Sequence, residues 1–332
     1  MVQSAVRHVT IDEQVGQRID NFLFAQFRKL PRARVYRMVR SGEVRVNGRR
    51  VKFHYRLSEG DEVRLPPVAN VIAPQVAQVP AGLTARLADA VLHEDQDLLV
   101  LNKPSGLAVH GGSGLSFGLI EALRSSHGPH IELIHRLDRE TSGVLLIAKN
   151  RKTLRRWQEQ MRPRVVDIGQ ASRAEGRVDS EPGAPRWNAS GRTSKQYLVL
   201  VQGVWPARVR SVRRALTKFT AASGERRVRC DPQGKSSRTD FQVLAAGTDY
   251  SLVQASLHTG RTHQIRVHCQ SVDRPVLGDA KYGSAAADAV AKRLGVKRLC
   301  LHASRLKADL GGTTQRFSAP VPDDLQRLID AL

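Results

Sequence analysis

The sequence HRLDRETSGVLLIA, residues 135–148, joins a highly charged loop directly to an apolar strand. The loop places the carboxylate of Asp138 between Arg136 and Arg139, and the run from Val144 to Ala148 is typical of a buried strand. A strand inside a sheet would hold the polar loop rigidly at its end. Taken alone, these charges fit a solvated turn with ion pairs, because charge runs are common on protein surfaces.

The interpretation changes because five further motifs occur in order along the chain. Together with HRLDRETSG they resemble the motifs of the ribosomal large subunit pseudouridine synthase family, and the resemblance covers nearly the whole chain. Six ordered motifs make a chance match implausible. The further motifs are LNKPSGLAVH (101–110), KQYLVLVQG (195–203), GRTHQIRVH (260–268), LGDAKYG (277–283) and RLCLHA (298–303).

The net charge predicts a polyanionic partner. Lys and Arg number 53 against 31 acidic residues, a formal charge of +22. This excess favours nucleic acid and salt-sensitive association, with an anionic membrane as the alternative. No apolar run approaches the roughly 20 residues of a transmembrane helix, and residues 1–14 contain no apolar signal core. We therefore expect a cytoplasmic protein, and a monomer because no apolar seam stands out.

The cysteine and histidine patterns argue against a metal site. Cys230, Cys269 and Cys300 form no CxxC pair, which fits a reducing compartment and not structural zinc. His263 and His268 are five residues apart, so on a helix they would point in different directions. We expect no metal.

Residues 16–65 have the pattern of a compact RNA-binding unit. Apolar residues recur at helical spacing over 19–27 and again over 35–39. The sequence GEVRVNGRRV (42–51) then alternates valine before an Asn47–Gly48 turn, a strong hairpin signal. Two helices followed by a small sheet resemble an S4 domain, a small α/β RNA-binding unit.

Cations outnumber acids in this unit. A solvated helix face would mix both signs to gain i,i+4 pairs, so the cluster favours phosphate binding. Because phosphate contacts fix position without reading sequence, we expect the unit to add affinity and orientation. The candidate RNA-binding residues are Arg32, Arg34, Arg37, Arg40, Arg45, Arg49 and Arg50.

Composition divides the chain into further segments. Residues 1–15 are expected to form an N-terminal arm. Residues 66–82 are rich in proline and uncharged up to Pro80, as in an extended linker. A catalytic domain follows over 83–332. Within it, residues 163–194 lack a sustained apolar period, so we expect a disordered insertion there.

Strands rich in Val, Leu and Ile alternate with helices over 83–332, which predicts an α+β fold. Gly311–Gly312 is expected to turn a late hairpin, and Pro322–Asp323 to begin a terminal helix. The resemblance implies the pseudouridine synthase catalytic fold, a mixed, largely antiparallel sheet with flanking helices. The predicted strands are 98–101, 144–148, 197–201, 241–244 and 252–257.

The resemblance implies isomerisation of uridines to pseudouridine in 23S ribosomal RNA or a partly assembled large subunit. This reaction breaks the N1–C1′ bond and forms a C5–C1′ bond, with no redox change and no group lost, so it requires no cofactor. A carboxylate suits attack at a sugar carbon with oxocarbenium character. The family assigns that role to Asp138. Direct attack at C1′ and a glycal-type route through C2′ both stay open.

Arg266 and Tyr197 are the other catalytic residues that the resemblance implies. An ionised Asp in a dry pocket requires a cation, which also lowers its pKa, and Arg266 has that place in the family motif. We expect a turn at Gly260 and a helix capped by Thr262, with Arg266 facing away from the buried side. Tyr197 would stack on the flipped uracil, and its hydroxyl is a candidate acceptor of the released proton.

Five residues have supporting roles by resemblance. Because the target base must leave its stack, another group must fill the gap, and Arg136 is the candidate wedge. His135 is expected to support the loop. Lys103 and Arg261 are expected to contact phosphate or to hold the loop, and Leu301 to line the uracil pocket.

Two other classes of function fit parts of the sequence. A noncatalytic ribosome-assembly factor on the same scaffold would not require the intact Asp138, Tyr197 and Arg266. A glycoside or nucleotide hydrolase would require a second carboxylate at controlled spacing to activate water, and no motif supplies one, although Glu140 is near in sequence. Which uridines are modified, and what the insertion does, stay open.

Overall fold

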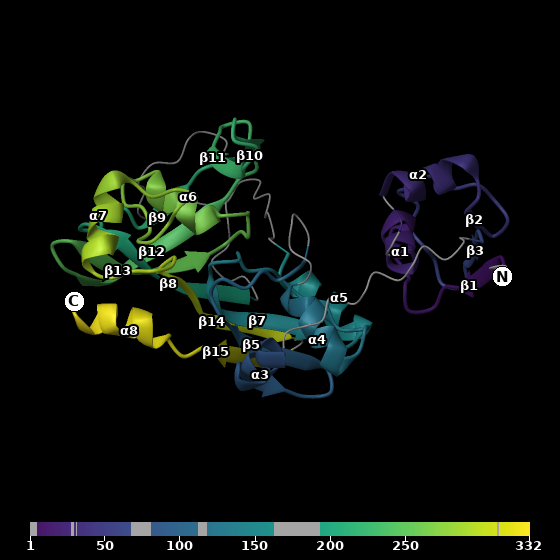
Figure 1. Ribbon diagram of the computed structural model, residues 1–332, viewed down its shortest axis with the longest axis horizontal. Coiled ribbons are helices and arrows are strands. Elements are labelled where there is room, and N and C mark those ends of the chain that lie inside the picture. The colour runs from purple at the N-terminus through teal and green to yellow at the C-terminus, as the bar shows by residue number, and fades with distance from the viewer. Residues whose placement is uncertain are drawn as a thin grey trace, which may run out of the picture. The chain divides into compact units, whose positions relative to one another are not determined.

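The computed structural model describes residues 5–27, 30, 32–67, 81–111, 118–162, 193–310 and 312–332. The chain divides into two compact units, Met1–Val79 and Pro80–Leu332 (Figure 1). Most of the expected linker at 66–82 and of the expected insertion at 163–194 lies outside the described residues. Within the described part, no helix is long and apolar enough to cross a membrane.

The N-terminal unit combines two helices with a small antiparallel sheet in the order β1-β3-β2. The predicted turn is present: Asn47 and Gly48 have φ values of 49° and 74°, and Val46 and Arg49 exchange backbone hydrogen bonds of 3.0 and 2.9 Å. The elements are β1 (Arg7–Thr10), α1 (Ile19–Gln26), α2 (Arg32–Ser41), β2 (Arg45–Val46) and β3 (Glu62–Leu65).

Residues 7–10 differ from the expected N-terminal arm, because they form β1 and pair with β3. Val9 lies opposite Val63 and packs against the core of the N-terminal unit. A strand of four residues with one inward-facing apolar side chain gives too short a pattern for a period of two to be detected. The sheet thus begins earlier in the chain than the sequence indicated.

The second unit is built on one large sheet in the order β4-β5-β7-β14-β8-β13-β12-β9, with β6 added beside β7 and β15 beside β14. Its strand pairs are antiparallel except for β7 and β14, which pair in parallel over His302↔Ser142 and Ala303↔Gly143. The strands are β4 (Val91–Glu94), β5 (Leu98–Lys103), β6 (Glu132–Leu133), β7 (Ser142–Ala148), β8 (Thr193–Gln202), β9 (Ser211–Arg213), β12 (Arg238–Ala246), β13 (Tyr250–Leu257), β14 (Leu301–Leu310) and β15 (Thr313–Ser318), with β10 (Leu216–Thr220) and β11 (Arg226–Cys230) in a separate hairpin.

Helices flank this sheet and confirm the α+β prediction (Figure 1). Strands β5 and β7 are apolar at nearly every position because both of their faces are buried. On one face, Val144 and Leu146 belong to a core cluster with Trp157 of α5 and Leu306 of β14. The helices are α3 (Ala81–Asp89), α4 (Leu119–His127), α5 (Arg151–Gln160), α6 (Gln264–Gln270), α7 (Ala285–Arg293) and α8 (Asp323–Asp330).

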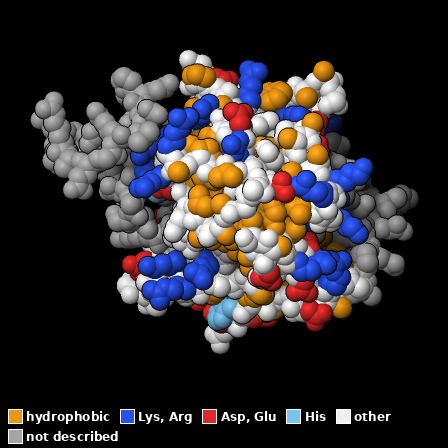
Figure 2. All heavy atoms as spheres, turned by 90° about the vertical axis from the view of Figure 1, so that its left-hand side faces the viewer, with side chains coloured by type: hydrophobic (Ala, Val, Ile, Leu, Met, Phe, Trp, Pro, Cys, Tyr) orange, Lys and Arg blue, Asp and Glu red, His pale blue; other side chains and the backbone are white. Residues whose placement is uncertain are grey.

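The five strands predicted in this unit are all present, as are the hairpin between β14 and β15 and the terminal helix that begins after Pro322. The surface at the end of the unit that carries α7 and α8 combines a central group of hydrophobic side chains with surrounding Lys and Arg (Figure 2). Asp and Glu side chains lie among the Lys and Arg of this face, and some of them form ion pairs, such as Asp249 with Arg293 and Asp324 with Arg298.

Candidate active site

The loop at 135–143 is held by the segment that follows β5. Lys103 is fully buried at the end of β5. Its ammonium group donates to the carbonyl oxygens of Pro104 (2.7 Å), Leu107 (2.8 Å) and Arg139 (2.9 Å). Burial lowers the pKa of Lys103 to about 7, against the opposing charges of Glu140 and Asp138. Of the two roles expected for Lys103, the structure thus gives it the role of holding the loop.

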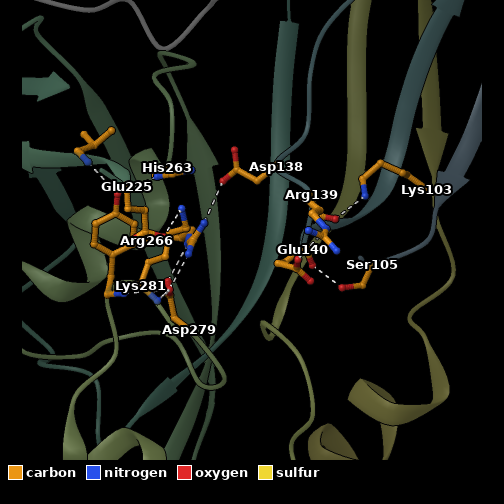
Figure 3. Close-up of polar contacts among 12 residues, drawn as sticks. Lys103, Ser105, Asp138, Arg139, Glu140, Glu225, His263, Arg266, Asp279 and Lys281 are labelled. Carbon is orange, nitrogen blue, oxygen red and sulfur yellow. Dashed lines mark hydrogen bonds and ion pairs between the residues drawn. The ribbon is translucent and has the colours of Figure 1, made fainter. Parts of the chain in front are cut away.

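Gly106 and Ser105, which follow Lys103, hold the same loop, and Figure 3 shows the contact of Ser105. The backbone N–H of Gly106 donates to the carbonyl of Arg139 at 2.9 Å, and Arg139 Nε donates back to the carbonyl of Gly106 at 3.0 Å. Ser105 Oγ donates to the carbonyl of Glu140 at 2.6 Å. The two residues after Asp138 are therefore fixed through their backbones, which fixes the direction of the aspartate as well.

His135 lies at the start of the loop and makes one hydrogen bond to the strand that follows it. Its Nε2 accepts the backbone N–H of Leu146 at 3.2 Å, so the imidazole is neutral at that nitrogen. Burial, followed by the positive charge of Lys195, lowers the pKa of His135 to about 3. A neutral, partly buried imidazole that accepts a backbone hydrogen bond fits a structural role.

Gly143 closes the loop where β7 meets β14. Its φ is +111°, and a Cβ at this position would lie 2.2 Å from the carbonyl oxygen of Ala303. Only glycine allows the two strands to approach so closely in this backbone conformation. Ser142, the preceding residue, donates or accepts a 2.9 Å hydrogen bond with His302 Nδ1 and accepts one from Arg298 at 3.0 Å.

The structure brings Asp138 and Arg266 together. Arg266 Nη1 lies 3.6 Å from Asp138 Oδ2 (Figure 3). The side chain of Asp138 is 27% exposed, whereas that of Arg266 is 5% exposed, so the carboxylate can be reached by a ligand and its cation cannot. The carboxylate therefore faces the ligand and has the guanidinium behind it.

Arg266 is held from its other side by Asp279. Arg266 Nε and Nη2 donate to the two oxygens of Asp279 at 2.7 and 2.6 Å. Burial alone would lower the pKa of Arg266, but the hydrogen bonds and charge of Asp279, together with Asp138, raise it above its ordinary value. Arg266 is thus permanently charged, and Asp279 fixes the plane of its guanidinium.

The helix that carries Arg266 differs from the prediction in two ways. It begins at Gln264, and its N-cap is His263 in the left-handed conformation, without a side-chain cap, so the expected cap at Thr262 is wrong. The side chain of Gln264 makes the turn instead, because its Oε1 accepts the N–H of Arg261 at 3.0 Å. Arg266 was expected to face away from the buried side, but it is itself buried, which the carboxylate of Asp279 makes possible.

Tyr282 and Lys281 surround this ion pair. The guanidinium of Arg266 lies 5.0 Å from the ring centre of Tyr282. The Tyr282 hydroxyl accepts the N–H of Val228 at 2.9 Å and shares a 2.7 Å hydrogen bond with His263 Nδ1. The Lys281 ammonium pairs with Glu225 at 2.8 Å. Tyr282 and Lys281, which lie around Arg266, therefore both contact the β10–β11 hairpin.

Tyr197 lies on β8, a central strand of the large sheet. It is 7% exposed. Burial raises the pKa of Tyr197 well above its ordinary value, and the negative charge of Asp138 raises it further. Leu301 is buried at the start of β14, opposite Val199 of the same strand β8. Asp138 is thus in ion-pair distance of Arg266 and near enough to Tyr197 for its charge to act on the phenol.

The two remaining arginine candidates of this unit differ in exposure. Arg136 is exposed two residues before Asp138. Arg261 is partly buried, and its Nε donates to the carbonyl of Ser236 at 3.2 Å. Arg136 is therefore the more accessible of the two to a ligand at Asp138.

The arginine candidates of the N-terminal unit are mostly exposed. Arg34 is the exception, because Glu43 holds it in a bidentate ion pair at 2.8 and 2.7 Å. The side chain of Arg32 lies outside the described residues. The exposed members are Arg37, Arg40, Arg45, Arg49 and Arg50, and the last two line an open cavity of about 700 Å³ with Lys52 and His54.

Sequence reasoning missed the residues that hold the catalytic candidates in place. Asp279 and Ser105 lie in the matched motifs LGDAKYG and LNKPSGLAVH but received no role. The only sequence signal for Asp279 was a carboxylate inside a matched motif, which does not by itself indicate its pairing with Arg266. No group of His, Cys, Asp and Glu side chains in the described part of the chain could hold a metal ion.

Comparison with known proteins identifies the family. The family model described as RNA pseudouridylate synthase matches residues 97–169 and 184–271, and that of the S4 domain matches residues 17–63. A protein of Escherichia coli O157:H7 named ribosomal large subunit pseudouridine synthase C is 44% identical over 98% of this chain and 95% of its own length. The chain belongs to the RNA pseudouridylate synthase family. It is therefore an isomerase, as the sequence predicted.

Further relatives agree with this membership. The Haemophilus influenzae protein of the same name is 42% identical over 100% of this chain and 97% of its own length. Among solved structures, human RNA pseudouridylate synthase domain containing 1 matches with a TM-score of 0.51 and 25% identity, covering 73% of this chain and 93% of that one. Human RNA pseudouridylate synthase domain containing 4, at 24% identity, shows the shared fold with a TM-score of 0.55 over 75% of this chain and 95% of that one. The predicted pseudouridine synthase fold with an S4 domain is confirmed.

Proposed function

We propose that this chain converts specific uridines of 23S ribosomal RNA to pseudouridine, with Asp138 as the nucleophile. One observation carries the proposal: an accessible carboxylate lies 3.6 Å from a buried arginine, in a chain whose relatives are named for this reaction on the large ribosomal subunit. The substrate is free 23S RNA or a partly assembled large subunit.

The two acidic partners of Arg266, Asp279 and Asp138, are held differently, and the difference suits Asp138 as a nucleophile. Arg266 forms its short bidentate pair with Asp279, and its contact with Asp138 is longer, at 3.6 Å. Arg266 can therefore orient Asp138 by its positive charge without holding it in a tight ion pair. An ionised carboxylate with accessible oxygen atoms is what attack on the ribose requires.

Tyr197 fits a second step of the same reaction. After the uracil is rejoined through C5, the proton on C5 must leave for the ring to become aromatic again. The ester at Asp138 breaks as the C5–C1′ bond forms, so Asp138 is again a charged carboxylate when the C5 proton leaves, and burial together with this charge raises the pKa of Tyr197. The Tyr197 hydroxyl would therefore accept the C5 proton on its oxygen while giving its own proton to solvent. We expect Tyr197→Phe to keep RNA binding, since the ring remains, and to lose conversion.

The proposed reaction rearranges bonds within one nucleotide and needs no second substrate. It breaks the N1–C1′ bond, makes the C5–C1′ bond and moves one proton from C5 to solvent while N1 gains one. No electron or group passes to another molecule, so the proposed chemistry is cofactor-free. Arg136 would occupy the gap left by the flipped base, Leu301 would line the uracil pocket, and Arg261 and the exposed arginines of the S4 domain would contact the RNA backbone.

The test compares wild type with Asp138→Asn on unmodified 23S RNA, with pseudouridine mapped by carbodiimide primer extension. Wild type should modify discrete uridines. Asp138→Asn should bind RNA but convert it at least about 10³-fold more slowly. Glu140→Gln is the matched control, because Glu140 lies in the same loop with a side chain 45% exposed, and it should convert at the wild-type rate.

Other outcomes would support the alternative functions. RNA that is bound but never converted, even in partly assembled subunits, would indicate an assembly factor. Abasic sites with free uracil would indicate a hydrolase, and loss of that activity in Glu140→Gln would supply its second carboxylate.

A further inference from the structure

Two buried cations of the second unit, Lys103 and Arg266, have hydrogen-bond acceptors or acidic partners. Lys103 donates to three carbonyl oxygens, and Arg266 pairs with Asp279 and Asp138. Lys195 differs from both. Among the described residues, no side chain or carbonyl accepts a hydrogen bond from its ammonium group, and no acid lies within ion-pair distance.

The position of Lys195 makes this unusual. It is partly buried on β8, where its register partners on the neighbouring strands are Leu257 and Leu306. Burial lowers the pKa of Lys195 to about 8. A charge held among leucines without a partner costs stability, so its presence calls for a ligand that supplies the missing negative charge.

The active site lies next to Lys195. Tyr197 is two residues further along β8, so the two side chains lie on the same face of the sheet. The positive charge of Lys195 also lowers the pKa of His135, three residues before Asp138 in the loop. Lys195 is therefore close to both the loop of the nucleophile and the strand of the stacking tyrosine.

We propose that Lys195 binds a backbone phosphate of the RNA next to the target uridine. The inference rests on the proposed function, since it takes RNA as the substrate. A lysine ammonium is a compact point charge that suits a phosphate, and a central strand fixes the position of its Cα. The contact would set where the flipped nucleotide enters, because phosphate contacts position the chain without reading its sequence.

Binding is the direct test, measured with unmodified 23S RNA in the Asp138→Asn background so that no conversion occurs. Lys195→Gln should weaken binding by about 10- to 100-fold, as expected for a charge-assisted hydrogen bond. The slope of log affinity against log salt should fall by about 0.7 to 0.9, the contribution of one phosphate. Lys195→Arg keeps the charge and should restore most of both quantities. The control Lys149→Gln should change neither, because Lys149 pairs with Glu94 at 2.5 Å.

Stability separates this role from a structural one. Since the cation is unpaired, Lys195→Met should unfold at a higher urea concentration than wild type while binding RNA more weakly. Unchanged affinity in Lys195→Gln would overturn the proposal. Weaker binding with an unchanged salt slope would also overturn it, because the contact would then be to an uncharged group. So would a Lys195→Met protein that fails to fold, since the lysine would then serve the fold.

The two proposals fail separately. If wild type binds 23S RNA but converts nothing, the proposed function fails, and the affinities of the Lys195 variants still show whether this side chain contacts phosphate. If wild type converts uridines and Lys195→Gln binds as wild type does, only the role of Lys195 fails.

Discussion

Replacing Asp279 by Asn removes one buried charge and leaves the shape of the side chain nearly unchanged. Asp279 is 2% exposed. It accepts hydrogen bonds from Arg266 Nε and Nη2 and from the backbone N–H groups of Lys281 and Tyr282, at distances of 2.6 to 3.0 Å. An Asn amide keeps one oxygen and turns an NH₂ group toward these donors.

The expected cost follows from those contacts. Breaking a buried ion pair by removing one partner costs about 3–5 kcal/mol, because the other charge stays buried. At least one N–H group also loses its acceptor, at about 1–3 kcal/mol. Asp138 offsets part of this loss, because it remains available to Arg266 at 3.6 Å. We expect Asp279→Asn to lower the free energy of unfolding by about 4 kcal/mol, and to slow conversion because Asp138 becomes the main partner of Arg266.

Urea unfolding followed by tryptophan fluorescence measures the free energy of unfolding of the unit Pro80–Leu332, which contains Asp279. The three tryptophans, Trp157, Trp187 and Trp205, all belong to Pro80–Leu332, so the signal reports on that unit alone. Asp324→Asn is the matched control. Asp324 also forms a bidentate pair, with Arg298 at 2.6 and 3.2 Å, but its side chain is 45% exposed. An exposed pair should cost less than about 1 kcal/mol.

Two results would refute the reasoning. A loss of less than about 1 kcal/mol in Asp279→Asn would mean that Arg266 does not depend on this carboxylate for its burial. Equal losses in Asp279→Asn and Asp324→Asn would mean that burial is not the source of the effect.

Three further predictions concern stability of the same unit. Lys103→Met should cost about 2–4 kcal/mol, because the carbonyl oxygens of Pro104 and Leu107 lose this donor and that of Arg139 keeps only the N–H of Gly106. It should also slow single-turnover conversion more than it weakens RNA binding, and equal effects on both would contradict loop holding. Gly143→Ala should prevent folding or cost more than about 3 kcal/mol, whereas Gly260→Ala, with no atom within 4 Å of the added Cβ, should be nearly neutral in the same urea assay. Burial lowers the pKa of His135 to about 3 and that of His302 to about 4, so the unfolded chain binds their protons first. Stability should therefore fall as the pH drops from about 6.5 to about 4, by about 1.4 kcal/mol per pH unit for each histidine, and a flat urea midpoint between pH 7 and pH 5 would contradict this.

Local sequence patterns predicted most of the fold. The Asn47–Gly48 turn adopts positive φ values at both residues, and the apolar run 144–148 became a strand buried on both faces. These features depend on neighbours in the chain. The strand at 7–10 was missed because its identity depends on pairing with β3, more than fifty residues away. The cap at Thr262 was wrong because the buried amide of Gln264, and not a local hydroxyl, makes the turn.

The resemblance named candidate residues for the site but not the residues that hold them in place. The resemblance named Asp138, Tyr197 and Arg266, and the structure brings Asp138 and Arg266 within ion-pair distance, with Tyr197 within range of the charge of Asp138. Asp279 could not be assigned from spacing, because its pairing with Arg266 depends on how the segment after α6 folds back. The choice between phosphate contact and loop holding for Lys103 likewise required the three carbonyl oxygens, which come from two separate segments.

The parallel contact between β7 and β14 has a consequence for the order in which the protein is made. Ser142 meets His302 across 160 residues of sequence. During synthesis the Asp138 loop leaves the ribosome long before β14 exists to pair with its strand, and contacts between such distant segments form slowly. A nascent or truncated chain that ends before β14 would display the arginines of the S4 unit without a completed catalytic sheet. It could hold RNA before it could act on it.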